Sequence, residues 1–193
     1  MELFLDTEFT GLRQNAELIS LALVGADDRW FYAEFTDFDR EELSDWHREY
    51  VLPYLFLEKR ERPDFASGQG TTFQGEREEV SRRLRQWLAG YERVEIWADA
   101  PAFDWVFFCE LFGGALYLPE NIFYLPFDLT TLLKLRGLDP DADRELLAPG
   151  WVAAHRGPKH NALFDAFLTR EICRQLGNPA DRNFDFLGEI EKK

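Results

Sequence analysis

Cysteine and long apolar runs are scarce in this sequence. Only Cys109 and Cys173 occur, and both lie in apolar helical patterns, so we expect free buried thiols in a cytoplasmic protein rather than a disulfide. No stretch approaches the roughly 18 uninterrupted apolar residues of a membrane helix, and we expect no membrane contact. The N-terminus lacks the basic region, apolar run and cleavage site of a secretory signal, so we expect no signal peptide.

Positive charge is scarce as well. The chain has 22 Lys and Arg against 36 Asp and Glu, a net charge of -14. Proteins that bind long duplex nucleic acid without sequence preference carry a basic patch or stripe, so this balance argues against such binding. Acids that hold divalent cations are neutralised locally, which leaves room for an enzyme that grips a few nucleotides at a chain end.

Several catalytic signatures are missing. We find no Gly-rich phosphate loop, no Ser or Cys triad signature and no zinc-ligand spacing. The segment 139–143 begins like a calcium-binding loop, but Arg144 and Gly150 occupy the sixth and twelfth positions, where that loop needs Gly and Glu. We therefore expect a surface loop there.

The first apolar segment runs directly into two carboxylates, Asp6 and Glu8. Alternate residues of a strand share a face, so the two side chains should point the same way. Buried charge is retained only when it is paired or coordinated. A strand-terminal Asp alone is often a turn or cap residue, but the pair predicts a metal site if further acids complete it.

Further acids follow later segments. Asp104 comes after an apolar strand, and His160 stands five residues before Asp165. Each has a simpler interpretation when taken alone: Asp104 could cap a helix, and His160 could be an exposed loop residue. Asp165 lies among apolar helix positions, where a carboxylate needs a partner.

In the order Asp-x-Glu, Phe-Asp, His-x4-Asp, these blocks resemble the DEDDh branch of the 3'-5' exonucleases, and in detail the small bacterial or phage exoribonucleases of that branch. The resemblance runs from the first residues to about Gln175. It implies one exonuclease domain over residues 1–193, with a core of about 1–176 and a short C-terminal tail. The implied fold is α/β, a ribonuclease H-like mixed five-stranded sheet flanked by helices.

The resemblance also implies roles. Asp6, Glu8, Asp104 and Asp165 match the ligands of two Mg²⁺ or Mn²⁺ ions, cations that prefer hard oxygen donors. His160 matches the general base, because an imidazole with a reference pKa of about 6.5 accepts a proton near neutral pH. The implied reaction removes nucleoside 5'-monophosphates from the 3' end of single-stranded RNA or 3' overhangs.

Substrate contacts are expected from an apolar group and a cationic group: Phe9, Leu12 and Phe103 against bases, Arg156 and Lys159 against phosphates. Core packing and a solvated charge cluster are the respective alternatives. One position departs from the family pattern, since Asp99 stands where Asn is frequent. An ionised Asp accepts hydrogen bonds but donates none, which argues against an orienting role there.

Two other functions remain open at this point. One is a 3'-5' exodeoxyribonuclease of the proofreading type, and the other is an inert nuclease-like module that binds nucleic acid or protein. RNA is preferred because of the similarity to stand-alone exoribonucleases. Family members are often dimers, so a homodimer is a further expectation.

The length of 193 residues and a 46% hydrophobic content suit one domain with a substantial core. Periodicity predicts five strands, at 2–6, 17–25, 30–35, 93–98 and 121–125. It predicts helices at 40–50, 76–89, 102–112, 129–135 and 161–176. Residues 57–75 and 137–159 are expected to be loops, the second one mobile without substrate.

Overall fold

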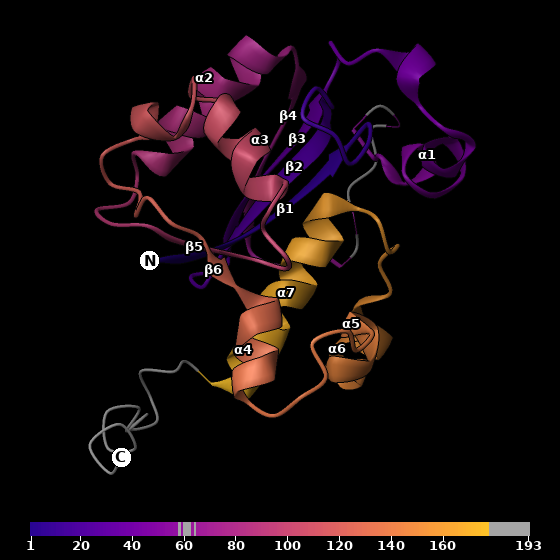
Figure 1. Cartoon of the computed structure of the whole chain (residues 1–193), viewed down its shortest axis with the longest axis vertical. Helices are drawn as coiled ribbons and strands as arrows, with labels where there is room; N and C mark the ends of the chain where they lie inside the picture. The colour runs from indigo at the N-terminus through magenta and orange to yellow at the C-terminus, as the bar shows by residue number, and fades with distance from the viewer. Residues whose placement is uncertain (58, 60–62, 64, 178–193) are drawn as a thin grey trace.

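The fold is built on one mixed sheet of six strands, in the order β4-β3-β2-β1-β5-β6 (Figure 1). The computed structural model describes residues 1–57, 59, 63 and 65–177. β1 pairs antiparallel with β2, and β2 with β3, while the three remaining pairs are parallel. The strands are β1 Glu2–Phe9, β2 Leu18–Gly25, β3 Arg29–Phe35, β4 Gln69–Gly75, β5 Glu95–Ala98 and β6 Phe127–Asp128.

Helices cover both faces of this sheet (Figure 1). They are α1 Asp45–Tyr50, α2 Arg77–Leu88, α3 Asp104–Glu110, α4 Leu129–Leu135, α5 Arg144–Leu147, α6 Pro149–His155 and α7 Ala162–Leu176. Single 3-10 turns lie at Arg40–Glu42, Leu52–Tyr54 and Ala115–Tyr117. No helix in the described part of the chain is long and apolar enough to cross a membrane.

Side-chain alternation along β1 divides the core into two layers. Leu3 and Leu5 join the cluster that packs under α2 and α3, whereas Phe4 joins the cluster under α7. Asp6 and Glu8 therefore point to the α7 face, because they have the same parity as Phe4. The expected placement of both acids on one face follows directly from this register.

Most of the expected elements are present. The three N-terminal strands and the antiparallel hairpin between β2 and β3 are confirmed, and so is the long last helix, α7. Cys109 and Cys173 are free thiols. The segment expected as one helix at 40–50 is instead a 3-10 turn followed by the short α1. The expected C-terminal tail lies outside the described residues from 178 onward.

The expectation of five strands is wrong, because part of the supposed loop 57–75 is a strand. β4 pairs in parallel with β3 along its whole length. Its residues are mostly exposed and include several Gly and Thr, so the strand shows no alternation of apolar side chains. Gly70 is required there, since a Cβ at this position would lie 2.0 Å from the Trp30 ring. Residues 121–125 form only an isolated bridge from Ile122 to Val94, and the last strand is β6.

The supposed loop 137–159 is also different, because it contains α5 and α6. Both helices are too short for periodicity to reveal. Asp143 starts α5 by accepting a hydrogen bond from the backbone N–H of Glu145, and Pro149 occupies the first turn of α6. Of the acids in segment 139–143, Asp143 is therefore a helix-cap residue.

Candidate active site

β1 supplies the first two acids of the site. Asp6 and Glu8 lie on the α7 face, and Glu8 is only 9% exposed. A break in register between Glu8 and Phe9 interrupts the pairing with β2, and such bulges re-aim side chains beside functional sites. Among the described residues, no hydrogen bond or ion pair reaches the carboxylate of Asp6 or of Glu8.

Asp104 reaches the same strand from α3. Its Oδ1 accepts hydrogen bonds from the backbone N–H of Thr7, at 3.0 Å, and from the Thr7 hydroxyl, at 2.5 Å. The residue between Asp6 and Glu8 thus holds the third acid against them. Asp104 does not act as the N-cap of α3, since Phe103 occupies that position.

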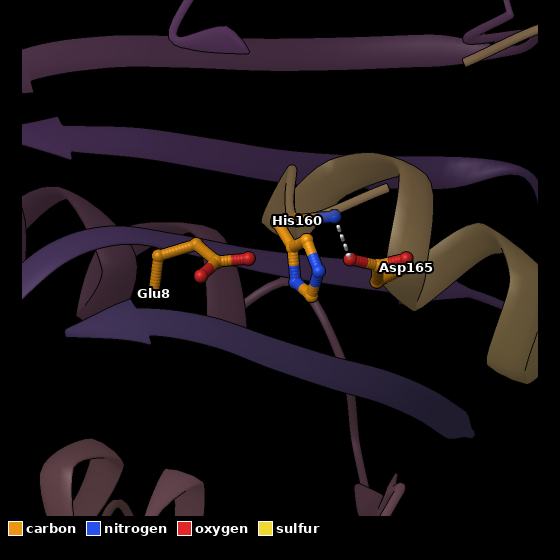
Figure 2. Close-up of side chains that lie close together, drawn as sticks. All are labelled: Glu8, His160 and Asp165. Carbon is orange, nitrogen blue, oxygen red and sulfur yellow. Dashed lines mark hydrogen bonds between the residues drawn. The ribbon is translucent and has the colours of Figure 1, made fainter. Parts of the chain in front are cut away.

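Asp165 and His160 come from the start of α7. The backbone N–H of His160 donates to Oδ2 of Asp165 at 2.9 Å (Figure 2). His160 has a φ of +63°, a left-handed conformation that few non-glycine residues adopt. Figure 2 shows the imidazole between the carboxylates of Glu8 and Asp165, and one ligand atom from each of the three residues lies within 4.8 Å of the others.

Burial and mutual repulsion favour the protonated forms of these acids. Desolvation raises the pKa of Asp6 and Glu8 well above the usual range, and the neighbouring carboxylates raise both further. Desolvation also raises the pKa of Asp104 to about 6 and that of Asp165 to about 7. The pKa of His160 is lowered, by burial and by the charge of Lys159. This shift favours the neutral imidazole, which is the form that can accept a proton.

This donor set fits divalent cations of the Mg²⁺ type. Four carboxylates converge, and among the described residues no hydrogen-bond donor or ion-pair partner reaches Asp6 or Glu8, so the protein itself does not compensate a negative charge on these two acids. Hard oxygen ligands are those that Mg²⁺ and Mn²⁺ prefer. A bound cation would also reverse the upward shifts of the acids' pKa values.

Asp99 has a structural partner. Its carboxylate accepts two hydrogen bonds from Arg144 on α5, at 2.6 and 2.9 Å, and one from the Thr130 hydroxyl at 3.0 Å. Its charge still contributes to the raised pKa of Asp6. An Asp suits this position because a bidentate guanidinium needs two acceptor oxygens. This ion pair could not be expected from the sequence, since Arg144 belongs to a segment expected to be a loop.

The expected substrate-binding residues fall into two groups. Phe9 stacks on Phe103 with ring centroids 5.8 Å apart, and Leu12 is 75% exposed beyond them. On the other side, Arg156 is exposed after α6, and the ammonium of Lys159 lies 3.8 Å from Asp143. Their roles toward substrate stay predictions.

One neighbour of the site was missed from the sequence. The indole of Trp46, on α1, meets the His160 ring edge-on, with centroids 4.9 Å apart and an interplanar angle of 73°. Nothing local in the sequence indicates this contact, because it joins α1 to the residues just before α7, more than 100 positions later in the chain.

Comparison with known proteins identifies the family. The model of the Rv2179c-like 3'-5' exoribonuclease domain matches residues 1–176. Two curated proteins of Mycobacterium tuberculosis strains, the 3'-5' exoribonucleases MT2234.1 and Rv2179c, are each 35% identical over 137 residues, which is 71% of this chain and 76% of theirs.

A solved structure supports the fold. The structure of S. pombe Pop2p, in its Mg²⁺- and Mn²⁺-bound form, superposes with a TM-score of 0.59 at 18% identity, covering 95% of this chain and 84% of that one. At this identity the likeness shows the ribonuclease H-like fold alone. The resemblance to the DEDDh exonucleases is thereby confirmed, and the chain belongs to the Rv2179c-like 3'-5' exoribonuclease family.

Proposed function

We propose that this protein is a two-metal-ion 3'-5' exoribonuclease that uses Mg²⁺ or Mn²⁺. The observation that carries the proposal is the convergence of Glu8, His160 and Asp165 to within 4.8 Å, beside two further acids. Such a set combines oxygen ligands with an uncharged base. When bound, two divalent cations stabilise the attacking and leaving oxygens of a displacement at phosphorus.

The protein side chains have separable tasks in this reaction. Asp6, Glu8, Asp104 and Asp165 hold the cations and so position the terminal phosphodiester. His160 accepts a proton from the attacking water, whose oxygen bonds to phosphorus while the bond from phosphorus to the 3' oxygen breaks. The shortened chain keeps that oxygen as its 3' hydroxyl, and the released nucleotide carries the phosphate at its 5' end.

The substrate is the 3' end of single-stranded RNA. The similarity to the M. tuberculosis 3'-5' exoribonucleases supports RNA over DNA, and the Mg²⁺- and Mn²⁺-bound form of Pop2p supports these cations. Phe9 and Phe103, with Leu12, contact the terminal bases, since base–aromatic stacking stabilises any sequence by roughly 1–3 kcal/mol per base. Arg156 and Lys159 contact backbone phosphates.

Three broader proposals accompany this function. The catalytic core is a single domain over residues 1–176, the range that the family model matches. The protein acts in the cytoplasm, and it forms a homodimer.

The test is product analysis with 5'-labelled single-stranded RNA and a matched DNA, with Mg²⁺, Mn²⁺ or EDTA. We expect metal-dependent shortening of the RNA from its 3' end, which Asp6→Ala and His160→Ala both abolish. A clear preference for DNA would contradict the substrate assignment. Full activity of either variant would contradict the assigned site.

A further inference from the structure

The His160 ring is oriented without a hydrogen bond. Among the described residues, no donor or acceptor reaches either of its nitrogens, although the backbone N–H is held by Asp165. A catalytic imidazole is usually oriented by the hydrogen bond of its second nitrogen. Here the ring contact that remains is the edge-on packing of Trp46, at 4.9 Å.

The helix that carries Trp46 is fixed to the strand that carries Glu8. The backbone N–H of Ser44 donates to Nδ1 of His47 at 3.2 Å, so Nε2 holds the proton and donates to the carbonyl of Phe9 at 3.1 Å. His47 is buried. α1 is thereby anchored one residue beyond Glu8.

The far end of this segment is fixed to the residue after His160. Asn161 is 1% exposed, and its Nδ2 donates to the carbonyl of Tyr54 at 2.9 Å. Its Oδ1 accepts from the backbone N–H of Phe164 at 3.2 Å and so caps α7. Residues 46–54 and 160–161 are therefore joined at two places, Trp46 with His160 and Tyr54 with Asn161, in a closed circuit of contacts that includes the imidazole.

We propose that Trp46 is a positioning residue that holds the His160 ring in its reactive orientation, and that Asn161 closes the circuit that keeps Trp46 in place. This inference rests on the proposed role of His160 as the general base. An indole suits the task because a large rigid ring packed in a T-shaped arrangement restricts rotation of the imidazole, while Trp46 itself stays 44% exposed.

The kinetic test compares Trp46→Ala, Trp46→Phe and the control Tyr50→Ala in Mg²⁺ with single-stranded RNA. Tyr50 lies on the same helix with a similar exposure of 41%, and its ring contacts Trp46. We expect Trp46→Ala to lower kcat by on the order of 10- to 100-fold with KM within about 3-fold, as for a misplaced catalytic group. Trp46→Phe keeps an aromatic ring beside His160 and should retain most of kcat. Tyr50→Ala removes a neighbour of Trp46 but leaves the Trp46–His160 contact in place, so kcat should stay within about 3-fold of the wild type.

Two kinetic outcomes would overturn the proposal. A raised KM with unchanged kcat in Trp46→Ala would mean that the indole binds substrate and does not position His160. Equal losses of kcat in Trp46→Ala and Tyr50→Ala would mean that general packing of α1 is responsible.

A second measurement is independent of activity. The chain has three histidines, so the imidazole resonances in an NMR spectrum of metal-free protein can be assigned with His160→Asn. We expect the His160 signals to lose their ring-current displacement in Trp46→Ala, while those of His155 stay unchanged. Unchanged His160 signals would overturn the positioning role, whether or not the wild type is active on RNA. Inactivity of the wild type on RNA would contradict only the proposed function.

Asn161→Ser separates the cap from the circuit, because Ser retains an acceptor for the start of α7 but cannot reach Tyr54. We expect a smaller loss of kcat than in Trp46→Ala. The double variant should lose less than the product of the two single losses, because both act through one imidazole. Strictly multiplicative losses would contradict the circuit.

Discussion

Two glutamates in one row of the sheet have opposite environments. Glu8 pairs with Ser20, and Ser20 pairs with Glu34 on the next strand, so all three side chains point to the α7 face. Glu34 accepts hydrogen bonds from the backbone N–H groups of Phe56 and Leu57, the hydroxyl of Tyr32 and the amide of Gln74. No described residue donates to Glu8.

The contrast distinguishes a structural acid from a functional one. Glu34 is 1% exposed and anchors the chain at Phe56 and Leu57 to β3, so its charge is compensated by the fold. The charge of Glu8 is opposed by burial and by neighbouring carboxylates. A buried acid that the protein leaves uncompensated either holds a proton or takes a partner from outside, and in this site a divalent cation fits.

The largest expected difference between Glu8 and Glu34 is in their effect on catalysis. Glu8→Gln should lower kcat/KM by at least about 1000-fold, because a lost metal ligand removes several kcal/mol of transition-state stabilisation. Initial rates on labelled RNA measure this effect, with the melting temperature as a check on folding. Wild-type activity of the Glu8→Gln protein would contradict the assignment of Glu8 as a metal ligand.

Acid should stabilise the metal-free protein. Asp165, at a pKa of about 7, and Asp104, at about 6, bind protons in the folded state at pH values where the unfolded chain does not. The free energy of unfolding should therefore rise by about 2–4 kcal/mol as the pH falls from 8 to 5, and this increase should be complete near pH 4. Urea titrations in EDTA measure it. Asp165→Asn should show a weaker dependence, whereas stability that falls over this range would contradict the raised pKa values.

Divalent cations should stabilise the same protein at pH 8. Mg²⁺ or Mn²⁺ at about 100 times its dissociation constant adds about 2.7 kcal/mol, which corresponds to roughly 5–10 °C in melting temperature for a chain of this size. A thermal melt with and without EDTA shows the shift. Glu8→Gln should lose most of it and Glu34→Gln should retain it, so equal shifts in both variants would contradict the comparison.

The difference between Glu8 and Glu34 also shows which features of the site could be predicted from the sequence. Asp6 and Glu8 were identifiable because alternation along a strand is a local rule, and the His-x4-Asp spacing similarly lies within one turn-and-helix segment. The donors to Glu34 come from three separate segments, and Arg144 reaches Asp99 from a short helix that has no periodic signal. The Trp46–His160 contact likewise depends on tertiary packing alone. β4 escaped prediction because its side chains are exposed and carry no apolar alternation.

The smallest expected effect is the one that completes the comparison. Glu34→Gln keeps one acceptor oxygen but turns the other into a donor that faces donors, so it should destabilise the fold by about 1–3 kcal/mol. Activity per folded molecule should stay within about 3-fold of the wild type, because Glu34 anchors Phe56 and Leu57 to β3 and is not one of the clustered residues Glu8, His160 and Asp165. Urea titration and rate measurements on the same preparation separate the two quantities. A loss of activity without a loss of stability would show that the row from Glu8 to Glu34 works as one unit, and the distinction between a compensated and an uncompensated acid would then fail.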